Sequence, residues 1–339
     1  MDSVTQAALG SAVGGAVLGR RLGWRAFAWG AGLGTLPDLD VLLSYGGPVA
    51  DFVFHRGASH AIAVHTLAAP LLGAVAWRLH RARGVGLAQW VLAVWLVLVT
   101  HALLDAVTIY GTRLLLPFAD EAVGLGSLFI IDPLYTLPLL VGIAAALAGR
   151  VGLRARRWNL TGLALSTLYV GWSIVAQQHV LNVAEAALAE RGIEPEHVLV
   201  TPAPFSTVLW RIVAMTAPGD DYYEGYYTVG SGREPHLTRF PSRPELLRPL
   251  AATPAVRRLR AFTDGYYAVG LQGDSVVITD LRMGAAPAYA FAFAVGQRED
   301  GTIVPMPDVA ATAPRPPLDR ILGEMLACAR GRPVALIAC

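Results

Sequence analysis

The sequence has 339 residues, of which 54% are hydrophobic and only 15% are charged, and its mean hydropathy is +0.48. Soluble domains carry about 25% charged residues, so this composition is that of a membrane protein. The net charge of +2 gives no reason to expect a nucleic acid partner. The only cysteines, Cys328 and Cys339, form no CxxC pattern, which argues against cysteine-ligated zinc and leaves a disulfide or two free thiols open.

Six apolar runs fill the first half of the chain. A spanning helix needs about 20 apolar residues, and the last three runs reach that length. The first run is short and rich in glycine, as a marginal span or a re-entrant segment would be, and Pro37 interrupts the second. Three GxxxG spacings, at Gly10/Gly14, Gly15/Gly19 and Gly30/Gly34, are typical of helices that pack closely in lipid. The runs cover residues 4–19, 26–43, 61–77, 87–108, 128–148 and 159–178.

The arginines predict how these segments are oriented. Ten of them lie in the first, third and fifth connections between runs, whereas the second and fourth hold only Arg56 and Arg113. Because basic residues stay on the cytoplasmic side, the bias predicts six segments with both termini outside the cytoplasm. No basic region precedes the first run, which argues against a cleaved signal peptide.

The composition and pattern of the sequence change near residue 180. Residues 180–191 are expected to form a helix, and short runs rich in Val, Tyr and Phe then alternate with Gly and Pro, as strands do. Two similar sequences, 224–230 and 264–270, predict two similar hairpins or strand edges. The expected fold is a membrane α-helical bundle over residues 1–179, followed by a soluble, extracytoplasmic α+β domain over 180–339. The other predicted elements are strands at Val198–Val200, Val208–Met215, Ser275–Thr279 and Ala288–Val295, and a helix at 318–330.

Histidines and aspartates at the ends of the apolar runs are the candidate functional residues. His101 and Asp105 are four residues apart, so they share one helix face and can reach one ion. Ionisable groups cost free energy in apolar surroundings, which makes them functional candidates by default. The alternative is a helix-end aspartate and a hydrogen-bonded intramembrane histidine.

Two further motifs lie on the same predicted side of the membrane. Asp38 and Asp40 follow Pro37; residues two apart do not share a helix face, so a site using both needs a local break at the proline. Otherwise one aspartate is a helix cap and the other faces water.

His55 and His60 bracket Arg56, whose guanidinium suits a phosphate or a developing oxyanion. Ser59 is a candidate N-cap for a helix that begins at His60, and an ordinary polar loop is the alternative for the whole motif. We interpret His65 as a hydrogen-bonding residue and Asp132 as the N-cap of a helix, because Pro133 follows it.

These motifs resemble the YdjM-like family of LexA-regulated, inner-membrane, metal-dependent hydrolases. The resemblance covers about residues 1–150 and implies a distant similarity to zinc phospholipase C and the single-strand nucleases. It implies that Asp38, His55, His101 and Asp105 are the metal ligands. Many relatives have His where this chain has Gln6, so the resemblance implies a reduced site of one or two zinc ions or another divalent metal. The matching segments are Met1–Gly10, Gly34–Asp40, His55–His60, Thr100–Thr112 and Ile131–Tyr135.

The leading hypothesis is therefore a metal-dependent hydrolase of the bacterial inner membrane, with its site at the outer face. Asp38, His55, His101 and Asp105 hold the metal, and the catalytic candidates are Arg56, Asp40 and His60. The expected partners are membrane lipid and a phosphoester or lipid-linked small substrate. The alternative is a non-catalytic membrane protein with a structural metal and an extracytoplasmic binding domain. A transporter ranks third, because the ligands lie near one face and no inverted repeat is apparent.

Overall fold

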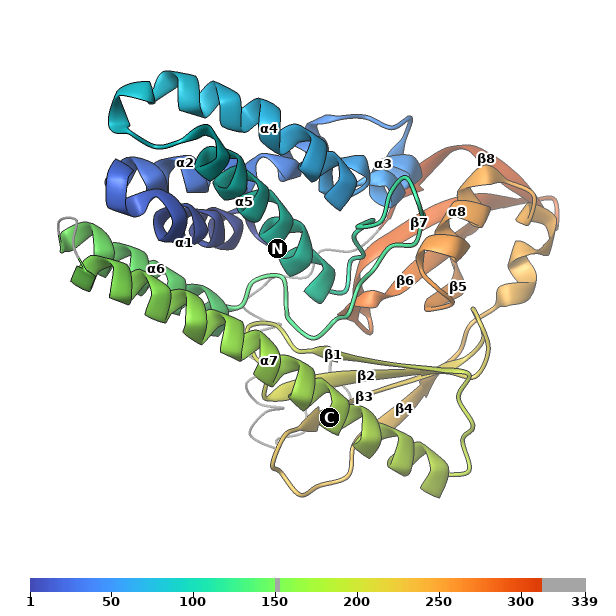
Figure 1. Cartoon of the computed structure of the whole chain (residues 1–339). Helices are drawn as coiled ribbons and strands as arrows, with labels where there is room; N and C mark the ends of the chain where they lie inside the picture. Colours follow the sequence, from blue (N-terminus) through green and yellow to red (C-terminus); the bar gives the residue numbers. More distant parts are fainter. Residues whose placement is uncertain (150–152, 313–339) are drawn as a thin grey trace. The chain divides into compact units, whose positions relative to one another are not determined.

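A computed structural model describes residues 1–149 and 153–312 of the chain (Figure 1). The predicted helix at 318–330, Cys328 and Cys339 lie outside the described residues. The chain divides into two compact units. A helical unit comprises residues 1–43, 55–174 and 204–206, and a C-terminal unit comprises 44–54, 175–203 and the residues from 207 onward.

Each of the six apolar runs contains an α-helix. The helices are α1 (Ser3–Leu22), α2 (Trp24–Thr35), α4 (Ile62–Leu79), α5 (Leu87–Val107), α6 (Pro133–Ala148) and α7 (Leu153–Glu190). Short helices join them: the 3-10 turns η1 (Pro37–Leu42), η2 (Ala58–His60) and η3 (Arg81–Arg83), and the α-helix α3 (Pro48–Phe54).

Three of the helices in the described ranges are long and apolar enough to cross a membrane, namely Ile62–Leu79, Leu87–Val107 and Arg156–Glu190. The apolar helix α6 is shorter, with 16 residues. Six spans therefore remain a prediction, and the described residues contain a helical region with three candidate spans.

The helix α5 forms the centre of the helical unit. It packs against α1, α2 and α4, and its buried residues Val94, Val97 and Leu98 join one apolar core with side chains of α1 and α6. The burial of these aliphatic side chains holds in place the end of α5, where His101 and Asp105 lie.

The glycine spacings in α1 and α2 allow the two backbones to approach closely. A Cβ atom on Gly10 would lie 2.3 Å from the Gly30 carbonyl oxygen, and one on Gly30 would lie 2.1 Å from the Gly10 oxygen. Only glycine fits these positions, which confirms the predicted close packing of the 10/14 and 30/34 pairs. This close packing of α1 and α2 sets the direction in which α2 leads into η1.

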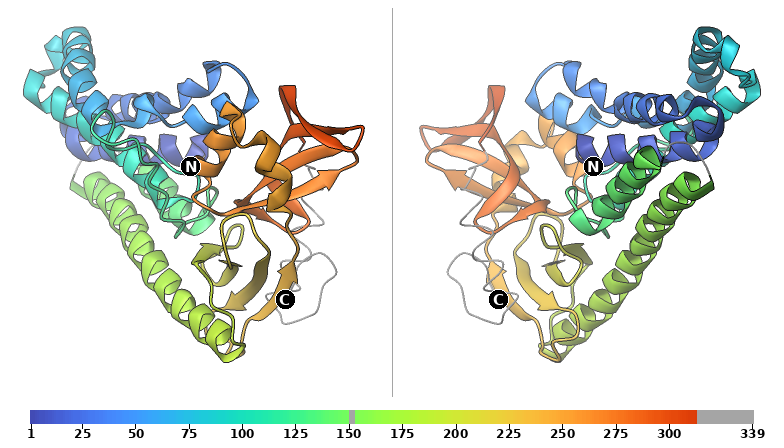
Figure 2. Two further views of the ribbon diagram at one scale, coloured as in Figure 1. Left: turned by 90° about the vertical axis from the view of Figure 1, so that its right-hand side faces the viewer. Right: turned by 90° about the vertical axis from the view of Figure 1, so that its left-hand side faces the viewer.

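The C-terminal unit contains two four-stranded antiparallel sheets, shown from two sides in Figure 2. The first sheet has the order β1-β2-β3-β4, with strands His197–Pro202, Leu209–Met215, Tyr222–Thr228 and His236–Phe240. The second has the order β5-β6-β7-β8, with strands Tyr267–Gln272, Ser275–Ala285, Ala288–Glu299 and Thr302–Ala311. In the sequence between β4 and β5, the chain forms η4 (Pro244–Leu250) and α8 (Pro254–Phe262).

The end of α7 covers the first sheet. Val180, Ala184 and Leu188 pack on Trp210 and Ile212, and all five side chains are buried. The predicted helix at 180–191 is thus the last part of one 38-residue helix. The predicted domain boundary at residue 179 also lies inside this helix.

All four predicted strands are present, as β1, β2, β6 and β7. The similar sequences 224–230 and 264–270 occupy different positions, since the first lies mostly in the inner strand β3 and the second leads into the edge strand β5. They are therefore not two equivalent hairpins.

Candidate metal centre

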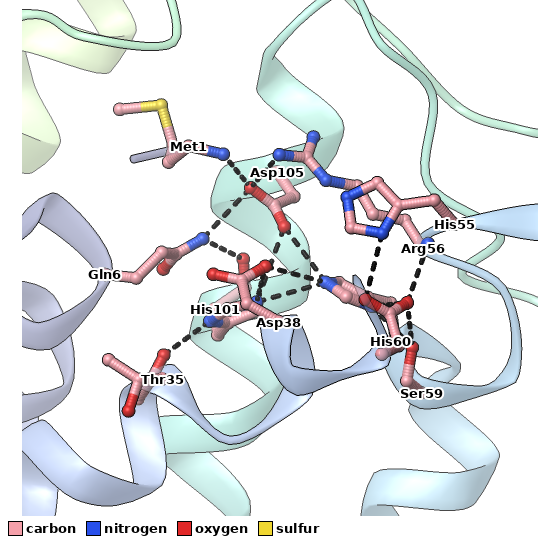
Figure 3. Close-up of polar contacts among 12 residues, drawn as sticks. Met1, Gln6, Thr35, Asp38, His55, Arg56, Ser59, His60, His101 and Asp105 are labelled. Atoms are coloured by element: carbon pink, nitrogen blue, oxygen red, sulfur yellow. Dashed lines mark hydrogen bonds and ion pairs between the residues drawn. The ribbon is translucent and has the colours of Figure 1, made fainter. Parts of the chain in front are cut away.

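Four side chains from three elements meet at the end of α5. Asp38 comes from η1, His60 from η2, and His101 and Asp105 from α5 (Figure 3). One potential ligand atom from each lies within 4.8 Å of the other three. The side chains of His60, His101 and Asp105 are at most 1% exposed, and that of Asp38 is 18% exposed.

The shortest distances in this group join the imidazoles to each other and to Asp105. His60 Nε2 lies 3.1 Å from His101 Nε2, and Asp105 Oδ2 lies 3.1 Å and 3.4 Å from these two nitrogens. Asp38 Oδ1 lies 3.5 Å from both. Two carboxylates and two imidazoles thus face one point in a buried place, where isolated charge is costly.

Local sequence explains how the elements reach this point. Pro37 has no backbone N–H to continue the α-helical hydrogen bonds, so α2 ends at Thr35; Leu36 keeps a helical backbone, and the chain tightens into η1. The helix α5 ends at Val107, where Thr108 turns to an extended conformation and its amide and hydroxyl both donate to the Asp105 carbonyl. The predicted break at Pro37 is confirmed.

Hydrogen bonds outside the group determine which imidazole nitrogen carries the proton. His101 Nδ1 lies 2.6 Å from the Gly34 carbonyl oxygen, which can only accept, so Nδ1 is the protonated nitrogen. Ser59 donates its hydroxyl proton to Asp40 Oδ2 at 2.7 Å and lies 2.9 Å from His60 Nδ1, so it accepts from that nitrogen. Neutral His60 and His101 therefore both direct an Nε2 lone pair into the group, as metal-ligating histidines do.

Asp40 does not join the four-residue group. Its carboxylate accepts from the Arg56 amide at 2.9 Å and from Ser59, and its Oδ1 lies 2.9 Å from His55 Nδ1. Burial alone raises the pKa of Asp40, but the contacts with His55 and Ser59 outweigh burial and hold it below its ordinary value. Asp40 thus organises the 55–60 segment and, through Ser59, the tautomer of His60.

Arg56 lies on the other side of Asp105. Its Nη2 lies 3.3 Å from Asp105 Oδ1, its Nη1 donates to Thr108 Oγ1 at 3.3 Å, and its guanidinium carbon is 5.1 Å from the ring centre of Tyr110. The buried Nε has no hydrogen-bond partner among the described residues. The φ angle of Arg56 is 58°, an unusual value for a residue other than glycine, of the kind that accumulates at functional sites.

Gln6 fills the space beside Asp105. It is fully buried, and its Nε2 donates to Asp105 Oδ1 at 3.0 Å and to the His101 carbonyl at 3.3 Å. The Met1 amino group also contacts Asp105 Oδ1. One oxygen of Asp105 is therefore surrounded by donors, while the other faces the two imidazoles.

The structure brings together three of the four predicted ligands, and His60 occupies the place predicted for the fourth, His55. His60, predicted to be catalytic, lies in the group, whereas His55, predicted to be a ligand, lies beside Asp40 with 22% of its side chain exposed. Sequence reasoning could not choose between them, because both flank the same short segment.

Three minor predictions also have an outcome. Ser59 is not a helix N-cap, since α4 begins at Ile62 with Ala61 as its cap residue. His65 bonds the Ser59 carbonyl at 2.8 Å, so its interpretation as a hydrogen-bonding residue is confirmed. Asp132 caps α6 by accepting from two backbone amides, as predicted. The link from His60 through Ser59 to Asp40 was missed, because Asp40 is 19 residues away from Ser59 in sequence.

The comparisons with known proteins place the helical part of the chain in a family. No curated protein and no solved structure matches the sequence. The family model described as YdjM inner membrane protein matches residues 1–180, which is more than half of the chain and contains every residue of the four-residue group. The chain therefore belongs to the YdjM inner membrane protein family.

Proposed function

We propose that this protein is an integral-membrane, metal-dependent hydrolase whose metal is held by Asp38, His60, His101 and Asp105. One observation carries the proposal: two buried imidazoles point their Nε2 atoms at each other from 3.1 Å, with two carboxylates beside them. Lone pairs and negative charges at this distance repel, and a cation at their common focus removes the repulsion.

Zinc fits this donor set best. Imidazole nitrogen and carboxylate oxygen are its usual non-thiolate ligands, although other divalent metals accept them too. When bound, zinc supplies Lewis-acid chemistry, since it acidifies water and polarises a phosphoryl or carbonyl group. The missing hydrogen-bond partner of the buried Asp105 Oδ2 among the described residues is consistent with a ligand atom.

Arg56 supplies the positive charge for an anionic substrate. Its guanidinium is only 7% exposed, is held against Asp105 and Tyr110, and retains a free Nε donor in the described part of the chain. A fixed guanidinium binds phosphate in two-pronged fashion and stabilises the charge that develops during phosphoryl transfer. A phosphoester is therefore the favoured substrate over a neutral ester or amide.

His55 is the group best arranged to accept a proton. Its Nδ1 lies 2.9 Å from Asp40 Oδ1, and its ring centre is 6.4 Å from that of His60. An aspartate that orients a histidine and stabilises its protonated form is a common arrangement for a general base. Asp40 then serves as the orienting residue for both His55 and, through Ser59, His60.

The surroundings of Asp38 and Asp40 favour a lipid-linked substrate. The side chains that alternate with them point away from the group: Leu39, Val41 and Leu42 are 52%, 69% and 78% exposed. An exposed apolar segment of this kind suits the membrane interface. Together with the ten-to-two arginine bias, it supports a site at the outer face of the inner membrane.

The test is hydrolysis of phosphodiester and phospholipid substrates by the full chain in detergent or in liposomes. We expect chelation to abolish turnover and added zinc to restore it, while His101→Ala remains inactive under all conditions. Turnover that survives both chelation and His101→Ala would contradict the proposal.

A structural metal is the second candidate function. If all four side chains bound the metal, they would supply the four protein ligands of a closed, structural zinc site, whereas catalytic sites keep a position open. Stoichiometric metal without turnover on any ester would favour this alternative, in which the metal ties η1 and η2 to α5.

A further inference from the structure

The segment 44–54 lies in the sequence between two helices of the membrane half but belongs to the C-terminal unit. The chain leaves the helical unit after Leu43 and returns to it at His55. Within this segment Gly46 and Gly47 have φ angles of 100° and 121°, which reverse the chain before α3 begins. The family match includes the segment, whereas most of the unit that holds it lies beyond residue 180.

Aromatic packing holds α3 in the C-terminal unit. The ring of Phe52, which is only 6% exposed, lies 4.9 Å from that of Phe262 in α8, and 4.5 Å and 5.2 Å from those of Phe291 and Phe293 in β7. Aromatic pairs at such distances contribute beyond the burial of their area. Arg258 of α8 also lies over the Phe54 ring, at 5.5 Å.

Both ends of the segment lead directly into the metal centre. Asp38 and Asp40 precede it, and His55 and Arg56 follow its last residue. The two ends are joined to each other, since the Asp40 carboxylate contacts His55 and the Arg56 amide. The segment is therefore a closed loop whose base is part of the site and whose tip is held by another unit.

We propose that the C-terminal unit positions the metal centre through this loop, with Phe52 as the positioning residue; this inference rests on the proposed function. A free loop would leave Asp38, Asp40 and the 55–60 segment to sample many conformations, whereas a held tip removes that freedom before the ion binds. Sites whose supporting contacts are loose bind poorly even when every ligand is present. The role assigned to the C-terminal unit is thus to support the site from outside the ligand set.

The test is cobalt binding by the full chain in detergent, followed by titration and by the visible spectrum of the bound ion. We expect Phe52→Ala to weaken binding by about tenfold or more and to change the spectrum, because ligand geometry loosens. Phe52→Leu, which keeps most of the apolar volume, should restore both. The matched control is Phe240→Ala, which removes an aromatic ring of β4, in the first sheet of the same unit, that is stacked on Tyr222.

A milder pair of variants covers the case in which Phe52→Ala does not fold. Arg258→Ala removes the cation over Phe54, and Arg257→Ala changes the neighbouring arginine of α8, which lines a cavity instead. Weaker binding in the first variant alone supports the inference. If Phe52→Ala and Arg258→Ala both bind cobalt as the wild type does, the inference about the C-terminal unit is overturned, but the metal centre is not. If the wild-type chain itself binds no metal, the proposed function is overturned as well.

Discussion

Ser59 is the residue on which the tautomer of His60 depends. Its single hydroxyl proton goes to Asp40, and its oxygen lone pair faces His60 Nδ1, so the neutral imidazole presents Nε2 to the metal centre. His101 obtains the same orientation from a backbone carbonyl, which no side-chain substitution removes. The two histidines thus differ in how easily their orientation is lost.

We predict that Ser59→Ala weakens metal binding by about 10–100-fold, because His60 then loses the partner that fixes its tautomer. Metal titration of the purified variant measures the effect. Ser59→Thr keeps the hydroxyl and should bind as the wild type does. Equal affinity in the alanine and threonine variants would exclude this role for Ser59.

Under the proposed function, Arg56 is the residue whose substitution distinguishes metal binding from turnover. We predict that Arg56→Lys reduces turnover of a phosphoester by about 10²-fold, since the ammonium cannot replace the two-pronged guanidinium. The metal content should not change, because Arg56 is outside the four-residue group. Unchanged kinetic constants would remove Arg56 from the site.

At the level of elements, the contact of α1 with α2 sets the position of η1. The carbonyl of Gly34, at the end of α2, also accepts a hydrogen bond from His101, so a shift of α2 would move two candidate ligands, Asp38 and His101. The glycines at this contact therefore help to set the positions of the side chains in the four-residue group.

We predict that Gly30→Ala lowers the free energy of unfolding by about 1–3 kcal/mol, because the new Cβ would lie 2.1 Å from the Gly10 oxygen. Gly32 lies on the same helix and has no atom within 4 Å of its potential Cβ, so Gly32→Ala is the matched control. Thermal unfolding in detergent compares the two variants. Equal midpoints would show that the close helix contact does not form.

A buried ion pair lies in the first sheet of the C-terminal unit and accepts a hydrogen bond from the second. Arg211 in β2 and Glu224 in β3 bond through two contacts of 3.0 Å and 2.8 Å, and Tyr289 of β7 donates to Glu224. Burial alone raises the pKa of Glu224, but Arg211 and Tyr289 hold it below its ordinary value of 4.5. Glu224 is 2% exposed, so solvent screens the pair little.

A lowered carboxyl pKa makes this stabilisation depend on pH. It is fully present above pH 4.5, the ordinary value, and is lost as the pH falls from there through the pKa of the folded state. We predict that Glu224→Gln removes this acid dependence and destabilises the unit by about 3–5 kcal/mol at pH 7, since it leaves Arg211 buried without a counter-charge. Unfolding midpoints at pH 7 and pH 4 provide the measurement. A variant as sensitive to acid as the wild type would assign the dependence to other groups.

For the whole molecule, the arginine distribution predicts the side of the membrane on which each part lies. A periplasm-active reporter fused after residue 339 should work, and the same reporter placed in the connection at residues 80–86 should not. Activity in the reverse pattern would invert the topology and place the metal centre on the cytoplasmic side.

The sequence was sufficient for much of the fold because its signals there are local. Each apolar run contains an α-helix, and the break at Pro37 in the second run follows from the chemistry of proline. The choice of His60 over His55, the serine link to Asp40 and the capture of α3 by the C-terminal unit all depend on contacts between distant residues. No periodicity or spacing in the sequence encodes such contacts, so they can be identified only in the three-dimensional structure.

The most direct test of the account is the metal content of the full chain purified in detergent, measured by elemental analysis for the wild type, His101→Ala, Asp105→Ala and His80→Ala. His80 is the control, because its Nδ1 contacts the Ala76 carbonyl at the other end of the helical unit. We predict stoichiometric zinc, or another divalent transition metal, in the wild type and in His80→Ala and almost none in the other two. Absence of metal from the wild type after reconstitution, or full retention in His101→Ala and Asp105→Ala, would contradict the assignment of the four-residue group as a metal centre.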